Sequence, residues 1–351
     1  MHLLHVVGAR PNFMKAAPVY RALSARSAVK QTLIHTGQHY DNNMSDIFFS
    51  QLSMPAPDVN LGVGSCTHAQ QTAEVMKRFE PIVLERKPDM VVVYGDVNST
   101  MAAALVCAKL RIQLAHVEAG LRSFDRTMPE EVNRLVTDQL ADLLFSHCED
   151  ANINLQREGL SPEKIHNVGN VMIDSLIRFL PQTERHKVNG LPERFALVTL
   201  HRPSNVDDPR VLRGILKSLL EINESLPVIF PVHPRTRQAV TTLDLDASVL
   251  HLLEPQPYIE FLALERRAVV VITDSGGVQE ETTYLKVPCI TLRANTERPV
   301  TVSLGTNVLV GDGGEKLRSE VSKVLGGKAK PGTIPPLWDG HAGERIAKIL
   351  Y

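Results

Sequence analysis

The stretch Ile112-Gln113-Leu114-Ala115-His116-Val117-Glu118 is a short, largely apolar run that ends in an acid. Such a run is typical of a buried strand, which places Glu118 at the carboxyl end of that strand. In an open parallel sheet this edge is where ligands bind. The nineteen residues from His116 to Arg134 hold four carboxylates and three arginines. Because buried acids are costly unless they are paired or used, the stretch is either a structural ion-pair network or part of a functional site.

Similar short runs recur along the whole chain, each ending in a polar residue or a glycine. In the first half they cover residues 3–8, 31–36, 90–95, 113–118, 143–146 and 165–169, and in the second half 196–201, 228–233, 249–253, 269–273, 289–292 and 307–310. Segments of helical period lie between them, including 69–85, 101–110, 210–223 and 315–325. Continuous apolar runs are typical of parallel strands covered on both faces. The alternation therefore predicts the α/β class with right-handed crossovers.

The 351 residues favour two domains over one. The alternating pattern pauses between about residues 174 and 194, where two prolines and a glycine interrupt a charged stretch, so we expect the domain boundary there. We expect one domain over 1–172 and a second over 173–335, with a cleft between the two similar halves. The remaining residues, 336–351, are expected to contain a helix that packs back on the body of the protein.

Composition and sequence pattern argue against several classes of partner and cellular compartment. The 38 Lys and Arg residues nearly balance 39 Asp and Glu, whereas a nucleic-acid or membrane-surface partner would usually leave a basic excess. The four cysteines are scattered, which argues against a disulfide framework and against a structural zinc site. The amino-terminal run is too short for a signal peptide, and no apolar run approaches the roughly 20 residues of a membrane span. We therefore expect a cytoplasmic protein with no metal.

Two segments follow predicted strands and open into predicted helices. The amino end of a helix in such a segment can bind an anion. Residues 8–15 carry Arg10 and Lys15 about one helical turn apart, a spacing that can hold phosphate oxygens; a solvated surface loop is the alternative. This segment is neither a Gly-x-Gly-x-x-Gly nor a Walker loop, so it gives a nicotinamide cofactor little support. In Ser275-Gly276-Gly277 the glycines let backbone amides approach an anion, unless the segment is only a capped glycine turn.

Further polar residues end other predicted strands. Asp96 follows one of them, although it could equally cap the next helix. His201 and Arg202 end another, where they suit an anion or a proton-transfer role, with a buried, satisfied histidine as the alternative. His233 has the same placement, and Arg298 adds a further cation. Cations and acids at strand ends favour chemistry on a phosphorylated sugar or nucleotide.

These segments, taken in order and spacing, resemble the non-hydrolysing UDP-N-acetylglucosamine 2-epimerases over essentially the whole chain. The resemblance rests on residues 8–15, Gly37-Gln38-His39, Gly95-Asp96, 116–122, 129–134, His201-Arg202, Pro255-Gln256, 274–281 and 296–299. It implies two Rossmann-like domains of the GT-B type with parallel sheets and an interdomain cleft, and usually a homodimer. No cofactor is implied.

The resemblance also implies a reaction, reversible epimerisation of UDP-N-acetylglucosamine to UDP-N-acetylmannosamine. The family eliminates UDP to give a 2-acetamidoglucal intermediate, then adds UDP back with the proton delivered to the opposite face of C2. Such a route needs a base and an acid near C2 and cations for the departing diphosphate. By resemblance, Asp96, Glu118 and Glu131 are the acid/base candidates. His201 would lie by the diphosphate or assist proton transfer.

The remaining assignments by resemblance concern binding and regulation. The substrate contacts would be Arg10, Ser275 and Gly277 at the phosphates, Glu281 at the ribose, Gln256 with Phe261 at the uracil, and Arg298 at the sugar. Lys15 and Gly276 are added to this set because their own segments have the anion-binding pattern described above. Some bacterial members bind a second UDP-N-acetylglucosamine as an activator, and Gln38, His39 and His233 match that region.

Three positions depart from the family pattern: Asn12 and Ser204 each replace a frequent glutamate, and Tyr94 replaces a frequent histidine. They leave open a related substrate such as a 2,3-diacetamido uronic acid. Three further functions also stay open, because the fold alone does not fix the activity. They are a GT-B glycosyltransferase, a hydrolysing epimerase and a non-catalytic sugar-nucleotide sensor.

Overall fold

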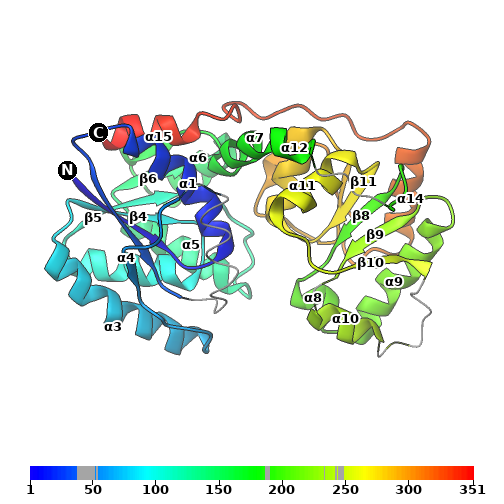
Figure 1. Cartoon of the computed structure of the whole chain (residues 1–351), viewed down its shortest axis with the longest axis horizontal. Helices are drawn as coiled ribbons and strands as arrows, with labels where there is room; N and C mark the ends of the chain where they lie inside the picture. Colours follow the sequence, from blue (N-terminus) through cyan, green and yellow to red (C-terminus); the bar gives the residue numbers. More distant parts are fainter. Residues whose placement is uncertain (38–51, 53, 186–189, 233, 242, 244–248) are drawn as a thin grey trace. The chain divides into compact units, whose positions relative to one another are not determined.

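The computed structural model describes residues 1–37, 52, 54–185, 190–232, 234–241, 243 and 249–351 (Figure 1). The chain divides into two compact units. Unit 1 consists of Met1–Ser175 together with Pro336–Tyr351, and unit 2 is Leu176–Pro335. Each unit has its own parallel sheet, so the predicted α/β class with two parallel-sheet, Rossmann-like domains of the GT-B type is confirmed.

Unit 1 is built on a seven-stranded parallel sheet in the order β3-β2-β1-β4-β5-β6-β7. Its strands are β1 (His2–Val7), β2 (Lys30–His35), β3 (Val59–Asn60), β4 (Met90–Tyr94), β5 (Gln113–Val117), β6 (Leu143–Ser146) and β7 (Ile165–Asn167). All six runs predicted in this half contain a strand. The additional strand, β3, has two residues, which is too short for a periodic pattern to reveal.

The helices of unit 1 alternate with these strands. They are α1 (Arg10–Ser24), α3 (His68–Arg86), α4 (Asn98–Leu110), α5 (Pro129–Leu140), α6 (Glu149–Arg157) and α15 (Ala342–Leu350), with a 3₁₀ turn over Pro162–Lys164. The carboxy-terminal helix α15 lies beside α1 (Figure 1). Their contact is close, because a Cβ added at Gly343 would lie 2.7 Å from the backbone of Pro18.

Unit 2 has a six-stranded parallel sheet in the order β10-β9-β8-β11-β12-β13. Its strands are β8 (Ala196–Thr199), β9 (Val228–Pro231), β10 (His251–Leu253), β11 (Val270–Thr273), β12 (Cys289–Thr291) and β13 (Asn307–Leu309). Its helices are α8 (Pro203–Val206), α9 (Pro209–Asn223), α10 (Pro234–Thr241), α11 (Tyr258–Arg267), α12 (Gly276–Leu285), α13 (Pro299–Ser303) and α14 (Gly314–Leu325). Each of the six runs predicted in this half contains one of these strands.

The pause predicted from about residue 174 is wrong in its first ten residues. Helix α7 (Val171–Thr183) covers them, and the division between the two units falls inside it. Ile173, Leu176 and Phe179 recur every three residues and are all buried, which gives the helix an apolar face despite its charged residues. That spacing was a stronger signal than the charges and the proline near the helix end.

In both sheets the strand order reverses at one point, and ligands of open α/β sheets bind at the carboxyl ends of the strands there. In unit 1 this switch point lies between β1 and β4, and in unit 2 between β8 and β11. The loops that leave these strands carry Asp96, His201 and Ser275, and Lys15 lies in α1, which follows β1; the sequence singled out all four. The topology therefore brings the candidate residues of each unit to one edge of its sheet.

Candidate active site

The loop after β1 is fixed by Asn12 at the switch point of unit 1. Its side-chain oxygen accepts the backbone N–H groups of Gly8 and Ala9, both at 3.0 Å, and its amide donates to the carbonyl of Tyr94 at 2.7 Å. Asn12 is buried by these contacts. The asparagine that departs from the family pattern thus ties the loop to β4.

Lys15 and Glu118 form a buried ion pair at the same edge. The Lys15 ammonium lies 2.6 Å from Glu118 Oε2, and each residue is only 5% exposed. Glu118 has a left-handed backbone with φ of 77°, and its N–H and that of Ala119 both donate to the carbonyl of Phe145 at 3.0 Å. Gly95 permits the close approach, because a Cβ there would lie 2.7 Å from Lys15 Nζ. The predicted phosphate ligand is therefore engaged by a predicted acid.

Asp96 and Glu131 are joined by one guanidinium. Arg134 Nη1 contacts Asp96 Oδ2 at 2.5 Å, while its Nη2 contacts Glu131 Oε2 at 2.6 Å. The Asp96 side chain remains 22% exposed, whereas that of Glu131 is 2% exposed. Arg134 therefore pairs with two of the three predicted acids.

A second buried network lies behind these acids. The His116 ring nitrogens contact Asp138 Oδ1 at 2.6 Å and the Gly95 carbonyl at 2.8 Å. Asp138 also receives Arg122 Nη2 at 2.7 Å, and Arg122 reaches Glu158 through two further bonds. Burial raises the pKa of Asp138, but His116 and Arg122 outweigh it and leave that pKa below its usual range. This part of the acidic stretch has the character of a structural ion-pair network.

In unit 2, Asp274 organises the loop after β8. It accepts the N–H of His201 at 3.0 Å, the N–H of Arg202 at 2.9 Å and the amide of Asn205 at 3.1 Å. His201 Nδ1 lies 2.8 Å from Asp274 Oδ1, while the side chain is 54% exposed. A carboxylate at Nδ1 fixes the ring and leaves its other nitrogen available.

Helix α12 begins at Gly276, and Arg298 packs directly on this glycine. A Cβ at Gly276 would lie 2.3 Å from Arg298 Nη1. The guanidinium contacts Glu297 Oε1 at 2.5 Å and Glu280 Oε1 at 3.0 Å. Burial raises the pKa of Glu297, but Arg298 and Arg293 outweigh it and hold that pKa well below its usual range. Ser275 and Gly277 flank Gly276 at the amino end of the helix, where backbone amides favour an anion.

Glu281 is buried on the second turn of α12 and accepts the Tyr258 hydroxyl at 2.7 Å. Burial raises its pKa to about 7, and the bonds from Tyr258 and Glu265 oppose that shift only partly. The buried Glu265 has a pKa well above its usual range because of burial and the neighbouring Glu281 carboxylate. Gln256, just before α11, and Phe261, within α11, are both half-buried.

With this geometry in place, comparison with known proteins identifies the family. The sequence profile of the family described as UDP-N-acetylglucosamine 2-epimerase matches residues 21–351. The chain belongs to the UDP-N-acetylglucosamine 2-epimerase family. It is therefore an enzyme of the isomerase class.

Individual relatives of this epimerase family cover the chain from end to end. The UDP-N-acetylglucosamine 2-epimerase of Methanocaldococcus jannaschii is 44% identical, over 100% of this chain and 99% of its own. A Pseudomonas aeruginosa UDP-2,3-diacetamido-2,3-dideoxy-D-glucuronate 2-epimerase is 42% identical, also over 100% and 99%. A crystal structure of the M. jannaschii enzyme in complex with UDP-GlcNAc and UDP superposes with a TM-score of 0.92 at 45% identity, over 100% of this chain and 99% of that one.

Two of the three departures from the epimerase pattern are turned into the protein. Besides Asn12, Tyr94 is fully buried, and its hydroxyl lies 2.7 Å from His5 Nδ1. Burial lowers the pKa of His5 to about 4, so His5 is neutral near pH 7. Ser204 is exposed. Of these positions, only Ser204 has a solvent-facing side chain.

Sequence reasoning did not select two acids that organise the candidate site, Asp138 and Asp274. Asp274 directly follows a strand, which is the signal that selected Asp96. Asp138 could have been found as the partner that a buried Arg122 requires. Arg10 begins α1, and the proposed activator residues Gln38, His39 and His233 lie outside the described residues.

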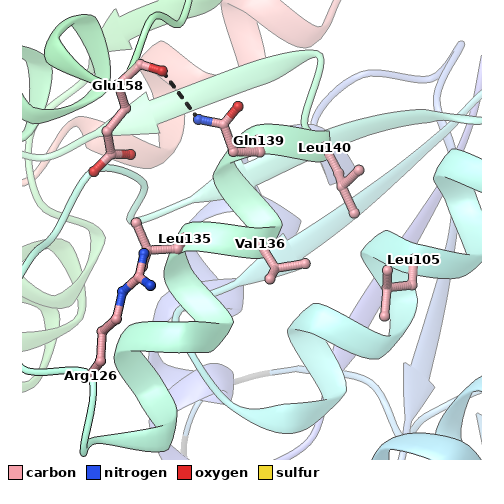
Figure 2. A pocket seen from close by; sticks show the side chains of 7 residues that line it. All are labelled: Leu105, Arg126, Leu135, Val136, Gln139, Leu140 and Glu158. Carbon is pink, nitrogen blue, oxygen red and sulfur yellow. Dashed lines mark hydrogen bonds between the residues drawn. The ribbon is translucent and has the colours of Figure 1, made fainter.

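Unit 1 also contains a pocket formed by α4, α5 and neighbouring segments (Figure 2). It is lined by Leu105, Arg126, Leu135, Val136, Gln139, Leu140 and Glu158. In Figure 2 the Gln139 amide points to the backbone carbonyl of Glu158, at 3.4 Å. Among the residues that the structure describes, no predicted site residue lines this pocket. Across the described parts of the chain, no helix combines the length and the apolar character needed to cross a membrane.

Proposed function

We propose that this enzyme interconverts UDP-N-acetylglucosamine and UDP-N-acetylmannosamine by eliminating UDP and adding it back. The observation that carries the proposal is the pair of acids at the switch point of unit 1. Asp96 is held by Arg134 at 2.5 Å and Glu118 by Lys15 at 2.6 Å. Two separately held carboxylates suit a reaction that removes a proton from one face of a carbon and returns it to the other.

The reaction balances without an oxidant. A carboxylate removes the C2 proton, the C1–O bond breaks, and its electron pair leaves with UDP to give the 2-acetamidoglucal. In the return step a carboxylic acid protonates C2 on the opposite face while a UDP oxygen attacks C1. We assign the proton transfers to Asp96 and Glu118, with Glu131 as a third candidate. Replacing Asp96 or Glu118 by its amide is expected to lower kcat by about 10²–10⁴-fold.

We propose that unit 2 holds the nucleotide of the same substrate. The amides at Ser275, Gly276 and Gly277 would receive the diphosphate at the start of α12, together with His201. Arg10 and Lys15 of unit 1 would complete the cationic environment of the leaving group. The other contacts carry over from the family: Glu281 at the ribose, Gln256 and Phe261 at the uracil, and Arg298 at the sugar.

Two relatives bear on the identity of the sugar. The M. jannaschii structure contains UDP-GlcNAc and UDP, whereas the P. aeruginosa relative is named for a 2,3-diacetamido uronate. Because Asn12 and Tyr94 are turned inward, two of the three departures give no reason for an altered sugar pocket. We therefore favour UDP-N-acetylglucosamine, with the uronate as the second candidate.

Incubation with UDP-N-acetylglucosamine in deuterated water tests this proposal. We expect deuterium at C2 and a product of manno configuration, followed by proton NMR. Unchanged substrate without release of UDP would rule out this substrate, and a parallel reaction with the diacetamido uronate then tests the second candidate. Net accumulation of UDP with free sugar would identify a hydrolysing enzyme, and turnover only with an added sugar acceptor would identify a glycosyltransferase.

We further propose a homodimer, cytoplasmic location, and activation by a second UDP-N-acetylglucosamine at Gln38, His39 and His233. We also propose an acid/base domain over 1–172, a UDP-binding domain over 173–335, and a helix in 336–351 that packs back on the body of the protein. Family membership supports these proposals.

Light scattering tests the dimer. For the activator, UDP-N-acetylmannosamine offered alone should react slowly until UDP-N-acetylglucosamine is added; full initial velocity without it would contradict the activation.

A further inference from the structure

Five hydrogen bonds converge on the Glu131 carboxylate. Oε1 accepts the N–H of Phe124 at 2.9 Å. Oε2 accepts the N–H of Ser123 at 2.9 Å and its hydroxyl at 3.1 Å, and it also receives Arg134 Nε at 3.1 Å and Nη2 at 2.6 Å. A carboxylate has about four lone-pair sites, so these five hydrogen bonds use its accepting capacity in full.

The donors distinguish Glu131 from the other two acids. Glu118 pairs with a single ammonium, and Asp96 keeps part of its side chain exposed. Four of the five bonds to Glu131 come from backbone N–H groups and a guanidinium, which do not release protons near neutral pH. To accept a proton, Glu131 would have to surrender one of these bonds in a buried site.

The titration of Glu131 points the same way. Burial raises its pKa, but the bonds from Ser123 and Arg134 outweigh burial and leave the pKa below its usual range. The ionised form is therefore the one that this environment stabilises.

What Glu131 holds is an unusual turn. Phe124 has a φ of 58°, in the left-handed region that bulky side chains rarely adopt, and it is 77% exposed. Such a conformation costs on the order of 1–3 kcal/mol and persists only where its surroundings impose it. The Glu131 bonds to the N–H groups of Ser123 and Phe124 supply that restraint.

The same carboxylate also fixes the group that orients Asp96. Arg134 binds Glu131 through two nitrogens and uses its third, Nη1, for Asp96 Oδ2. With Glu131 ionised in place, the guanidinium is held where its Nη1 contacts Asp96.

We infer that Glu131 is a positioning residue of the epimerisation and not a carrier of the C2 proton. It fixes the turn at Ser123 and Phe124 and the guanidinium that orients Asp96. This inference rests on the proposed function, because it assigns the proton transfers to Asp96 and Glu118.

Glu131→Gln tests the inference, because the amide group of glutamine turns an N–H toward either the turn or Arg134. We expect kcat to fall about 10²-fold, the size of effect that a small misplacement of reacting groups produces. The midpoints of the pH–kcat profile are expected to stay where the wild type has them. Loss of one limb of that profile would overturn the inference, since it would mean that Glu131 itself titrates in the reaction.

A double variant separates positioning from proton transfer. Glycine adopts positive φ without strain, so Phe124→Gly removes much of the need for the restraint. We expect F124G to recover at least about tenfold of the kcat lost in E131Q, while F124G alone stays within about threefold of the wild type. Absence of any recovery would contradict the proposed restraint. Glu130→Gln, on the exposed neighbouring residue, is the matched control and should leave kcat unchanged.

Amide hydrogen exchange provides a readout that does not depend on the substrate. In the wild type the N–H groups of Ser123 and Phe124 are expected to exchange slowly, and in E131Q at least about tenfold faster, with E130Q as the control. Equal exchange in all three proteins would overturn the inference. If the wild type fails to place deuterium at C2 of UDP-N-acetylglucosamine, the proposed function fails for that substrate, and the exchange experiment still decides the restraint.

Discussion

Two buried acids, Glu118 in unit 1 and Glu281 in unit 2, are accommodated in different ways. In unit 1, Glu118 is paired with the Lys15 ammonium at 2.6 Å. In unit 2, Glu281 is bonded by the Tyr258 hydroxyl at 2.7 Å and faces a second buried acid, Glu265. The first arrangement stabilises a charged carboxylate, and the second favours a shared proton. Burial alone therefore does not determine whether an acid is charged. The hydrogen-bond donor beside it, an ammonium or a hydroxyl, also decides.

The largest effect is expected from removing the cation of the first arrangement. Lys15→Met removes the buried ammonium beside Glu118, which should lower the free energy of unfolding by about 3–5 kcal/mol. Urea unfolding at pH 7 measures the loss.

The control for this prediction is Lys77→Met, which removes the exposed partner of Glu74. It should change the free energy of unfolding by less than about 1 kcal/mol. Adding Glu118→Gln to Lys15→Met should restore part of the stability. If the double variant is no more stable than Lys15→Met, loss of the ion pair between Lys15 and Glu118 is not the cause of the lower stability.

The sequence predicted the fold better than it predicted these pairings. Continuous apolar runs and helical spacing suffice to predict strands and helices, because burial on both faces is a local property of each segment. The pairing of Lys15 with Glu118 joins residues about a hundred positions apart, so it depends on the strand order. The same holds for Tyr94 and His5, which meet only because β1 and β4 are neighbours.

The next effect concerns the second arrangement and depends on pH. Burial raises the pKa of Glu281 from 4.5 to about 7, so the folded protein binds this proton more tightly than the unfolded chain. The resulting stability is present below about pH 4.5 and is lost as the pH rises through 7. We expect a loss on the order of 2–3 kcal/mol between pH 4.5 and 8, measured by urea unfolding across that range.

Glu265→Gln should reduce this pH dependence, because its amide donates to Glu281 and leaves one ionisable carboxyl where there were two. Glu254→Gln, at an exposed acid paired with Arg237, is the control and should preserve the wild-type dependence. An unchanged slope in Glu265→Gln would show that the two buried acids are not coupled, and the contrast between the units would then reduce to burial alone.

The smallest effect tests whether unit 2 also depends on cations. Gly276→Ala places a Cβ 2.3 Å from Arg298 Nη1, in a guanidinium already fixed by Glu297 and Glu280. Arg298 must move, which weakens its hold on both acids. We expect a loss of about 1–2 kcal/mol in the free energy of unfolding and a raised KM for the UDP-sugar.

Gly214→Ala, at an exposed position of α9 with no atom within 4 Å of the added Cβ, should instead stabilise the protein by about 0.5–1 kcal/mol. If both substitutions stabilise the protein equally, Arg298 tolerates displacement and the acids of unit 2 do not need it. A loss confined to Gly276→Ala would mean that unit 2 uses both arrangements, with arginines at the start of α12 and a shared proton one turn further along.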